Sequence, residues 1–155
     1  MTSPAIRTAE RSDAHQTAKA LALTFQHDPV ISWMLPSEGS RIRRLRRYYV
    51  TELRQESLRH KAVDVASKDG RIVGAALWLP PGTWSPAFGY LRAFGRRVDV
   101  ASRYMSVANR AHPVDTPHWY LAHIGVDPSW RGQGVGSALL RSRLARCDEE
   151  GLPAY

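Results

Sequence analysis

Residues 118–136 read HWYLAHIGVDPSWRGQGVG, an apolar segment followed by three glycines that alternate with other residues. The apolar part, rich in aromatic and β-branched side chains up to Val126, predicts a buried central strand. Asp127-Pro128 ends this strand, and the residues after Gly134 predict a helix. Glycines between a strand and a helix let successive backbone N–H groups point outward, and the helix start adds further donors and a positive dipole end. The stretch therefore predicts a site for a phosphate or pyrophosphate.

Two other glycine-rich phosphate motifs do not fit this turn. A dinucleotide fingerprint starting at Gly132 needs glycine or alanine where Ser137 stands, and one starting at Gly134 needs it where Leu139 stands. A P-loop ends in Gly-Lys-Ser/Thr, and no lysine lies near this turn. The spacing therefore indicates an anion-binding turn of another kind. The alternative is an ordinary tight strand-to-helix turn.

The rest of the chain predicts a mixed α+β domain when it is followed outward from this turn. Apolar residues recur at helical spacing in some segments and alternate in others, and proline and glycine clusters separate them. The stretch from His27 to Pro36 is interpreted as a turn. In the last helix we expect inward-facing Val135, Leu139, Leu140, Leu144 and Cys147. The expected elements are a strand at 4–9, helices at 13–26 and 38–59, a hairpin at 62–79 with an Asp-Gly turn, a mostly helical segment at 84–111, the strand at 118–126, and a helix that stops at Gly151.

Composition places the 155 residues in one globular domain, residues 1–155. No apolar run approaches the roughly 18 residues that span a bilayer, and no signal peptide opens the chain, so we expect a cytoplasmic protein. The formal charge of +8 raises the alternative of a nucleic-acid-binding module. Only Lys19, Lys61 and Lys68 are lysines, so the charge is arginine spread along the chain. The arginine-rich segment 41–49 has the spacing of an amphipathic helix with a solvated face. We therefore expect no nucleic-acid and no membrane partner, and the lone Cys147 indicates helix packing and no metal site.

The segment from Val126 to Leu140 closely resembles the acetyl-CoA motif of the GNAT N-acetyltransferases, Arg/Gln-x-x-Gly-x-Gly/Ala after a strand that ends in Val-x-Pro. With the strand end and the whole of the following helix included, the match covers about a fifth of the chain. The order of elements resembles that superfamily over the whole length. Residues 25–36, the long insert before His118 and residues 150–155 are similar to the branch that includes puromycin N-acetyltransferase. The resemblance implies a GNAT-like, mostly antiparallel sheet flanked by helices.

The resemblance also implies a cofactor and a reaction. Acetyl-CoA would be the donor, and a primary amine of a small molecule would accept the acetyl group directly in a ternary complex. By analogy, backbone groups of residues 124–126 would pair with the pantetheine amides. The implied cofactor-binding residues are Ile124, Gly125, Val126, Arg131, Gly132, Gln133, Gly134, Val135, Gly136 and Ser137.

Proton handling is predicted from the strand before the turn. Strand alternation puts His118, Tyr120, Ala122 and Ile124 on one face, opposite His123. Position 120 aligns with the site where the superfamily often carries a glutamate or histidine base, and this chain has Tyr120. We therefore expect Tyr120 and His118 to organise a water relay. The alternatives are a core aromatic for Tyr120, a polar strand-entry residue for His118, and a satisfied buried histidine for His123.

The acceptor side of the site is less specified. Asp28 is a candidate for binding the acceptor's cationic group, although Asp before Pro is also a turn signal. Trp33 and Trp84 are candidates for an aromatic acceptor wall, with core packing as the alternative. In the superfamily the general acid is commonly a tyrosine on a helix that this sequence does not reach. We thus expect a domain that lacks the C-terminal strands and helix. Such a domain could bind CoA without turnover, act on protein amines, or pair with a second copy through an exposed sheet edge.

Overall fold

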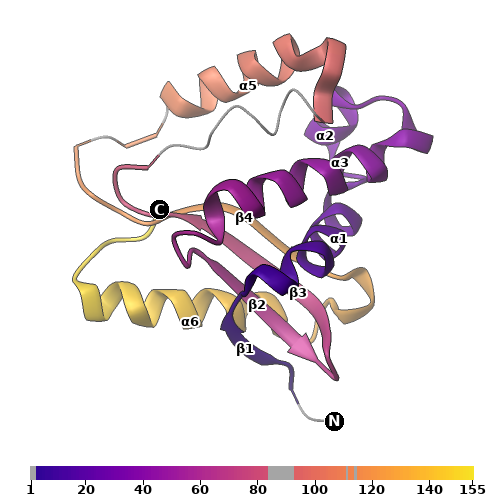
Figure 1. The fold of residues 1–155 in the computed structure, drawn as a ribbon. Helices are drawn as coiled ribbons and strands as arrows, with labels where there is room; N and C mark the ends of the chain where they lie inside the picture. The colour runs from indigo at the N-terminus through magenta and orange to yellow at the C-terminus, as the bar shows by residue number, and fades with distance from the viewer. Residues whose placement is uncertain (1–2, 84–92, 111, 114) are drawn as a thin grey trace.

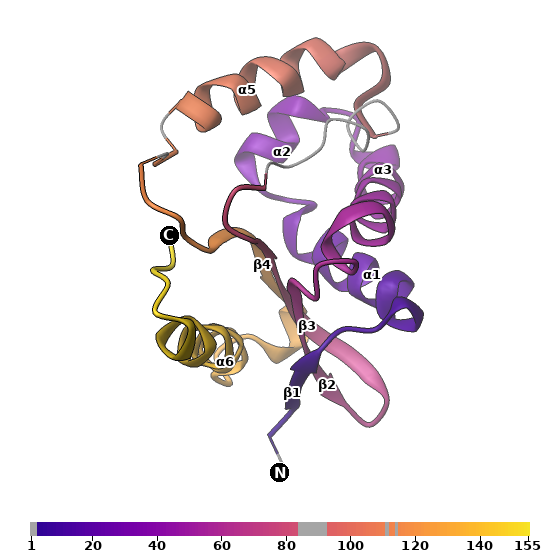
Figure 2. The same cartoon turned by 60° about the vertical axis from the view of Figure 1, so that its left-hand side comes forward.

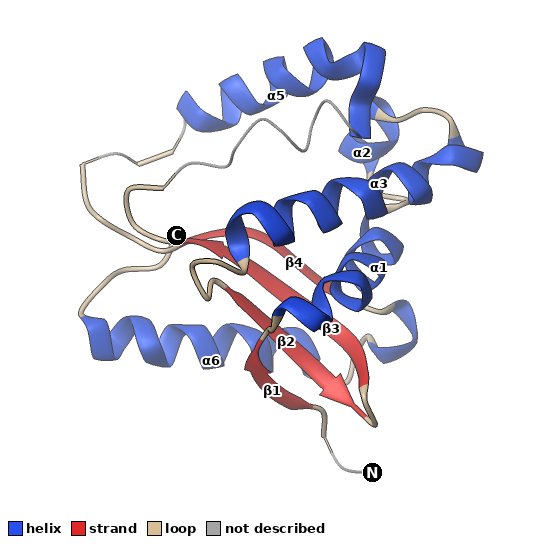
Figure 3. Cartoon of the chain, viewed as in Figure 1, coloured by secondary structure: helices blue, strands red, loops and turns tan. Residues whose placement is uncertain are grey.

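The computed structural model describes residues 3–83, 93–110, 112–113 and 115–155, and it contains a four-stranded antiparallel sheet (Figures 1 and 3). The strands lie in the order β1-β2-β3-β4. Their bounds are Ala5–Thr8 for β1, Val63–Lys68 for β2, Arg71–Leu79 for β3 and Tyr120–Val126 for β4. The expected strand at 4–9 and the expected hairpin are confirmed, as is the mixed α+β class.

The hairpin of β2 and β3 turns where the sequence predicts. Asp69 and Gly70 have φ values of 49° and 73°, so both central residues of the turn are left-handed. That geometry matches the right-handed twist of the two strands, and the Asp-Gly pair tolerates it better than most residues. The turn fixes the register in which β3 runs next to β4.

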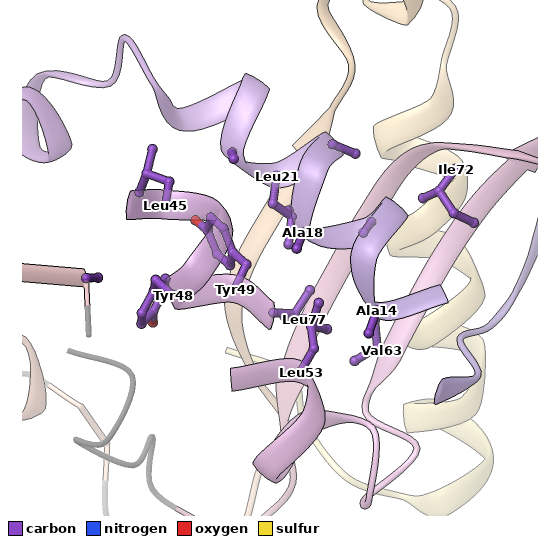
Figure 4. Packing of buried hydrophobic residues seen from close by; sticks show 14 of the residues in the cluster. Ala14, Ala18, Leu21, Leu45, Tyr48, Tyr49, Leu53, Val63, Ile72 and Leu77 are labelled. Atoms are coloured by element: carbon purple, nitrogen blue, oxygen red, sulfur yellow. The ribbon is translucent and has the colours of Figure 1, made fainter. Parts of the chain in front are cut away.

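Helices cover both faces of the sheet (Figure 2). Helix α1 (Ala14–Phe25), entered through a 3-10 turn at Arg11–Asp13, and helix α3 (Glu38–Glu52) pack on one face. Helix α6 (Val135–Glu150) packs on the other. Figure 4 shows the first of the two cores, which includes Leu21, Leu45 and Tyr49 of the helices and Leu77 of β3. Helices α1 and α3 thus bury their apolar residues against this face.

The predicted turn at 27–36 is wrong over most of its length, because Pro29–Met34 forms a short helix, α2. Asp28 stands at its N-cap, where the carboxylate accepts a hydrogen bond from the Ile31 amide at 3.0 Å. Proline suits the first helical position because its missing N–H would be unpaired there. The same two residues that indicated a chain break therefore start a helix.

Arg41 departs from the solvated arginine face expected for residues 41–49. It is buried, and its guanidinium donates to three backbone carbonyls, at 2.7 Å to Leu35, 2.9 Å to Gln26 and 3.2 Å to Pro36. One side chain thereby fastens the start of α3 to the segments on both sides of α2. Arginine serves this purpose because its fork of donors can satisfy several carbonyls at once.

Two predicted helices have different ends from those expected. Helix α3 passes at Leu53 into a π-helical turn that ends at Ser57, so the helical conformation stops just short of the expected residue 59. The segment expected at 84–111 contains helix α5 (Val98–Arg110), which follows a 3-10 turn at Gly95–Arg97. Residues 84–92, which the same expectation included, lie outside the described residues.

Helix α6 buries Val135, Leu139 and Cys147 as expected, and partly buries Leu140. Leu144 was expected inside, but 41% of its surface is exposed, and the neighbouring Arg143 is 1% exposed instead. The buried residues 135, 139, 143 and 147 recur every fourth position, and residue 144 lies about 100° away from that stripe. Gly151 has a φ of 65° and ends the helix, as predicted.

The expected central position of β4 is not what the described sheet shows. Strand β4 is half-buried and lies at the sheet edge, with β3 as its neighbour. Its entrance pairs in parallel with the C-terminal residues through a bridge between Trp119 and Ala154. The amide of Leu121 also donates to the carbonyl of Tyr155 at 2.9 Å. The C-terminal residues thus lie beside the entrance of β4.

Candidate functional site

The turn between β4 and α6 has the geometry of an anion cradle. Gly132 and Gly134 have φ values of 74° and 76°, and a Cβ added at either would meet no atom within 4 Å. Among the described residues, the amides of residues 132–137 donate no hydrogen bond. The first helical turn has no internal acceptors for its N–H groups. Open space and free donors therefore coincide where the sequence places a pyrophosphate.

Asp127 and Ser129 hold the entrance to this turn in place. The Asp127 carboxylate accepts hydrogen bonds from the Ser129 amide at 2.9 Å and from its hydroxyl at 2.6 Å. These bonds, with the charges of Arg71 and Lys19, lower the pKa of Asp127 against the opposing effect of burial. The side-chain amide of Gln133 donates to the Ser129 carbonyl at 3.3 Å. The side chain of Gln133 is thus occupied inside the turn, which leaves its backbone amide for a ligand.

The backbone of β4 presents donors and acceptors at its open edge. The Asp127 amide donates to the Val73 carbonyl at 2.9 Å, so this residue faces β3. In an antiparallel pair the direction alternates, so the amides and carbonyls of Ile124 and Val126 point away from β3. The Val126 carbonyl accepts the Thr24 hydroxyl at 3.1 Å. The expected pantetheine partners Ile124 and Val126 therefore lie where an added strand could pair with them.

Gly125 has a different role from its neighbours in this strand. Its backbone faces β3, and a Cβ at this position would meet Leu21 and Thr24 of α1 at 3.0 Å. The glycine is buried and lets α1 approach the strand closely. Its contribution to a cofactor site is thus the placement of the strand rather than a hydrogen-bonding group at the edge.

A cavity of about 420 Å³ lies between β4 and the helices α1, α2, α3 and α5. Most of its lining is apolar or aromatic. The groups in it that can carry a charge near neutral pH are Asp28, His112 and His123. Other lining residues are Phe25, Val30, Ile31, Met34, Leu45, Tyr48, Tyr49, Leu79, Thr83, Phe94, Tyr104, Met105, Ala108, Tyr120, Leu121, Ala122 and Ile124. A cavity of this volume and character suits a small organic ligand.

A β-bulge in β4 changes which of its side chains face this cavity. Leu77 is opposite His123, but Trp78 is opposite Leu121, so Ala122 is an extra residue in the strand. Opposed residues share a face, and Leu77 belongs to the core under α1 and α3, whereas Trp78 belongs to the core under α6. The expected alternation is therefore wrong after Tyr120. Tyr120 and His123 share the cavity face, and Ile124 packs on the α6 side.

His118 reaches the cavity only through another histidine. Its Nδ1 lies 2.7 Å from the Thr116 carbonyl, and its Nε2 lies 2.9 Å from Nε2 of His112. The His112 ring, which lines the cavity, is 4.4 Å from the Tyr120 ring centroid to centroid. Burial and the charge of His118 lower the pKa of His112. The structure thus brings together Tyr120 and His118, with His112 as an intermediate residue that the sequence analysis missed.

His123 faces a buried carboxylate from α3. Its Nε2 lies 3.9 Å from Oε2 of Glu52 and 3.4 Å from the Tyr48 hydroxyl. The rings of Phe25, Tyr48 and Tyr49 surround the imidazole at steep angles, with centroids 5.3–6.1 Å away. The side chain of Glu52 is 4% exposed, and Oε2 accepts no hydrogen bond from the described residues. His123 is therefore half-buried, with the Tyr48 hydroxyl as a hydrogen-bond partner and the Glu52 carboxylate nearby.

The acceptor-side candidates are placed differently from one another. Asp28 lines the cavity while its carboxylate caps α2. Trp33 is 57% exposed and is not part of the cavity lining, and its carbonyl accepts a hydrogen bond from Arg97 at 3.2 Å. Trp84 lies outside the described residues. Of the two candidates that the structure describes, Asp28 lines the cavity and Trp33 does not.

The turn and the sheet edge can be compared with known proteins. The model of the acetyltransferase (GNAT) family matches residues 27–155, which include the whole of the turn. The chain belongs to this family. A Corynebacterium glutamicum structure described as histone acetyltransferase HPA2 and related acetyltransferase is 32% identical, with a TM-score of 0.71, and the alignment covers 94% of this chain and 72% of that one.

Two more distant structures share the fold. A polyamine N-acetyltransferase from Drosophila melanogaster is 18% identical with a TM-score of 0.59, over 96% of this chain and 72% of that one. A GNAT family acetyltransferase from Brucella melitensis, solved with acetyl-CoA, is 20% identical with a TM-score of 0.51, over 96% and 70% of the two chains.

Membership makes the chain an acetyl-CoA-dependent N-acetyltransferase, as the sequence motif predicted. The GNAT cofactor fits the residues present, because the left-handed glycines leave open space in front of unpaired amides. Acetyl-CoA supplies the thioester from which the acetyl group is transferred. No helix in the described part of this GNAT chain has the length and apolar character needed to cross a membrane.

Glu52 is a second residue of the site, after His112, that the sequence analysis did not find. Its neighbours Tyr49, Thr51 and Leu53 are buried, but a glutamate in an arginine-rich helix is expected on the solvated face, so its own burial has no marker in the sequence. Its partner His123 is 71 positions away in the sequence. Only the packing of α3 on the sheet shows that the two meet.

Proposed function

We propose that this GNAT enzyme transfers the acetyl group of acetyl-CoA to a primary amine of a small molecule, directly in a ternary complex. The observation that carries the proposal is the cavity of about 420 Å³, bounded by the same strand whose open edge runs to the anion cradle. A concave cavity of this volume, with a mostly apolar lining and a few polar groups, suits a small molecule with an amino group.

The cofactor half of this proposal rests on the turn. The free amides of residues 132–137 hold the pyrophosphate. The Arg131 amide donates to the Pro128 carbonyl at 3.4 Å, and its exposed side chain adds a positive charge at the rim. Ile124 and Val126 pair with the pantetheine amides along the open edge of β4. Gly125 keeps α1 close behind the strand.

The chemical half places proton transfer on the cavity face of β4. The amine must lose a proton before it can attack the thioester, and Tyr120 is positioned to hold a water that carries this proton. From this water the proton can pass through His112 to His118. Asp28 lies at the wall of the cavity, where its carboxylate attracts a cationic acceptor.

The acceptor's identity is proposed from the resemblance in residues 25–36 and 150–155, which favours amines of the kind that the puromycin N-acetyltransferase branch modifies. The cavity supports an acceptor with an apolar or aromatic body, since few of its lining groups are polar. Two alternatives to a small-molecule acceptor remain in the proposal. In one the acceptor is an amine of a protein, and in the other the chain binds CoA without turnover.

The experiment that tests this proposal measures the free thiol released from acetyl-CoA with a panel of amines. The panel contains aminonucleosides, arylalkylamines, polyamines and a lysine-containing peptide. Thiol release with a small amine supports the proposal. Release with the peptide alone favours the protein acceptor, and binding of acetyl-CoA without release with any amine favours the binding-only alternative. No thermal shift with acetyl-CoA and no release would contradict the assignment of the cofactor site.

Gly134→Trp tests the cradle, and Gly70→Trp is its matched control. Both glycines have φ values near 75°, at 76° and 73°, and open space around an added Cβ. The backbone strain is therefore the same, but only residue 134 stands before the free amides. We expect Gly134→Trp to raise the Kd for acetyl-CoA at least about tenfold, or about 1.4 kcal/mol, in calorimetry. Equal affinities in the two variants would place the pyrophosphate elsewhere.

The open edge of β4 also carries the proposal of a homodimer or strand exchange. Among the described residues, this edge is paired only near Trp119 and Leu121. Unpaired edges favour association with another copy. Light scattering across a range of protein concentrations, with and without acetyl-CoA, tests it, because a cofactor that occupies the edge should compete with the second copy.

A further inference from the structure

Two histidine-containing groups face the cavity, and they differ in what stands behind them. At the entrance of β4, His118 is backed by the Thr116 carbonyl and by His112. Past the bulge, His123 is backed by the carboxylate of Glu52, 3.9 Å from Nε2. A carboxylate behind an imidazole orients the ring and stabilises the positive charge that forms when it takes up a proton. A second imidazole cannot stabilise such a charge in this way.

Glu52 is an unusual carboxylate to find in this position. It comes from the last turn of α3, where it is buried between the helix and the sheet. The described residues offer Oε2 no hydrogen bond, although a buried acceptor without a donor is destabilising. Other buried polar atoms also lack a partner, Nη1 of Arg143 among them, but Glu52 is directed at a side chain that lines the cavity, and this placement indicates a functional requirement.

The surroundings of His123 suit an imidazole that gains and loses a proton. The ring lines the cavity with 26% of its side chain exposed, so a ligand can reach it. Phe25, Tyr48 and Tyr49 hold it at steep ring angles of 73°, 80° and 89°. Its orientation is therefore fixed while one side remains open to the cavity.

The bulge at Ala122 connects His123 to the proposed reaction site. Without the extra residue, Tyr120 and His123 would lie on opposite faces of β4. With it, both residues line the cavity on the same face of the strand. The strand irregularity thus places a proton acceptor on the face where the amine is expected.

We propose that His123 accepts the proton of the acceptor amine, directly or through the water at Tyr120, and that Glu52 is the residue that positions it. This inference rests on the proposed function and deepens it. It assigns His123, rather than His118, as the end of the relay.

The proton balance of the step is as follows. The amine enters as R–NH₃⁺ and gives one proton to the ring nitrogen of His123 that does not face Glu52. The ring becomes an imidazolium whose Nε2 lies beside the Glu52 carboxylate. The neutral amine then forms a C–N bond with the thioester carbonyl carbon as the C–S bond breaks. A second nitrogen proton neutralises the departing thiolate to give CoA–SH, and the third remains in the amide. His123 returns its proton to solvent through the open side of the cavity.

The experiment compares wild type with His123→Gln and Glu52→Gln, and it uses His15→Gln as the control. His15 is an exposed histidine of α1 whose Nε2 lies 3.0 Å from Arg54, away from the cavity. We expect kcat/KM for the amine to fall at least about 100-fold in His123→Gln, and about tenfold or more in Glu52→Gln. The His15 control should match wild type. Calorimetric Kd values for acetyl-CoA should stay constant in all four proteins, since none of the changed residues lies in the cradle.

Two further measurements separate a proton acceptor from a merely structural residue. The kcat/KM of wild type should fall on the acid side of its pH profile, and this fall should be absent in His123→Gln and displaced in Glu52→Gln. Added imidazole should restore activity to His123→Ala but not to a Tyr120→Phe variant. The other titratable groups around the cavity, which must be considered in the profile, are Tyr48, Tyr49, Asp28, Tyr104, His112 and Tyr120.

The outcomes distinguish the two proposals. No thiol release by the wild-type chain with any amine overturns the proposed function, and the assignment of His123 with it. Thiol release by wild type, with an unchanged rate and pH profile in His123→Gln, overturns the assignment and leaves the function standing. A larger loss in His118→Gln than in His123→Gln does the same, because it moves the end of the relay to the other histidine.

Discussion

The sheet buries one carboxylate on each face, and the two have opposite environments. On the α6 face, Asp64 of β2 is 1% exposed and accepts a hydrogen bond from the guanidinium of Arg143 at 2.8 Å. Arg146 is a second cation, 3.8 Å away. On the α3 face, Glu52 is 5% exposed, and its nearest charged partner is His123 at 3.9 Å. The first carboxylate is neutralised inside the protein, and the second is directed at a cavity.

This difference separates a structural charge from a functional one. Burial raises the pKa of Asp64, and the hydrogen bond from Arg143 offsets part of that effect. Arg143 is itself buried, stacks 4.7 Å above the Trp119 ring, and donates to the Lys61 carbonyl at 3.2 Å. The pair thus ties β2, α6 and the entrance of β4 together. No described cation holds Glu52 in the same way, so its charge is available to the imidazole in front of it.

Acid-to-amide substitutions test this comparison through the free energy of unfolding. Asp64→Asn should change it most. It keeps the shape of the side chain but leaves Arg143 buried without a counter-charge. We expect the free energy of unfolding to fall by about 3 kcal/mol, measured by urea denaturation at pH 7. The kcat of the folded fraction should stay near wild type, because the pair is not in the cavity.

The double variant Asp64→Val with Arg143→Met is the control for this prediction. Removing both charges and filling the space with apolar atoms should recover most of the lost stability. If Asp64→Asn unfolds at the same urea concentration as wild type, the buried Asp64–Arg143 ion pair does not stabilise the fold. Asp64 and Glu52 would then not differ in their structural roles.

Glu52→Gln should have the opposite sign in stability. The substitution removes a buried negative charge that has no close cation, so the free energy of unfolding should stay constant or rise by up to about 1 kcal/mol. The same variant is the one expected to lose activity. A loss of more than about 2 kcal/mol in urea denaturation would show that Glu52 has a structural role like that of Asp64.

The sequence allowed the backbone geometry of the turn between β4 and α6 to be predicted. Alternating glycines, the strand end at Asp127-Pro128 and the following helix are local features, and their geometry depends on neighbouring residues. Gly132 and Gly134 are left-handed for reasons that three or four residues determine. The hairpin turn and the stop at Gly151 were predictable on the same grounds.

The acceptor side could not be predicted in the same way, because it depends on contacts between distant elements. A bulge in β4 reverses the alternation after Tyr120, and one extra residue leaves no clear mark in an apolar strand. Arg143 was missed because the helical pattern assigns apolar residues to the core, and the partner that makes burial possible, Asp64, is on a different element. Glu52 was missed for the same reason.

A third carboxylate, Asp13 at the start of α1, should show the smallest effect. It is 8% exposed and accepts two hydrogen bonds from Arg7 of β1, at 2.6 and 2.9 Å, but 42% of the Arg7 side chain is exposed. It also accepts the Glu10 amide at 2.8 Å. Partial exposure brings this pair closer to a surface salt bridge than to the Asp64 pair, and solvent screens it.

We expect Asp13→Asn to lower the free energy of unfolding by about 1 kcal/mol or less at pH 7. The hydrogen bond from Arg7 lowers the pKa of Asp13, and burial opposes this. A carboxyl whose pKa is lower in the folded than in the unfolded state stabilises the fold above the unfolded value, near 4, and this contribution is lost as the pH falls through the folded value. The difference between wild type and Asp13→Asn in urea denaturation should therefore be constant above about pH 5 and shrink in more acidic solution. A difference that grows as the pH falls would reverse the sign and show that burial, not Arg7, dominates at Asp13 as it does at Asp64.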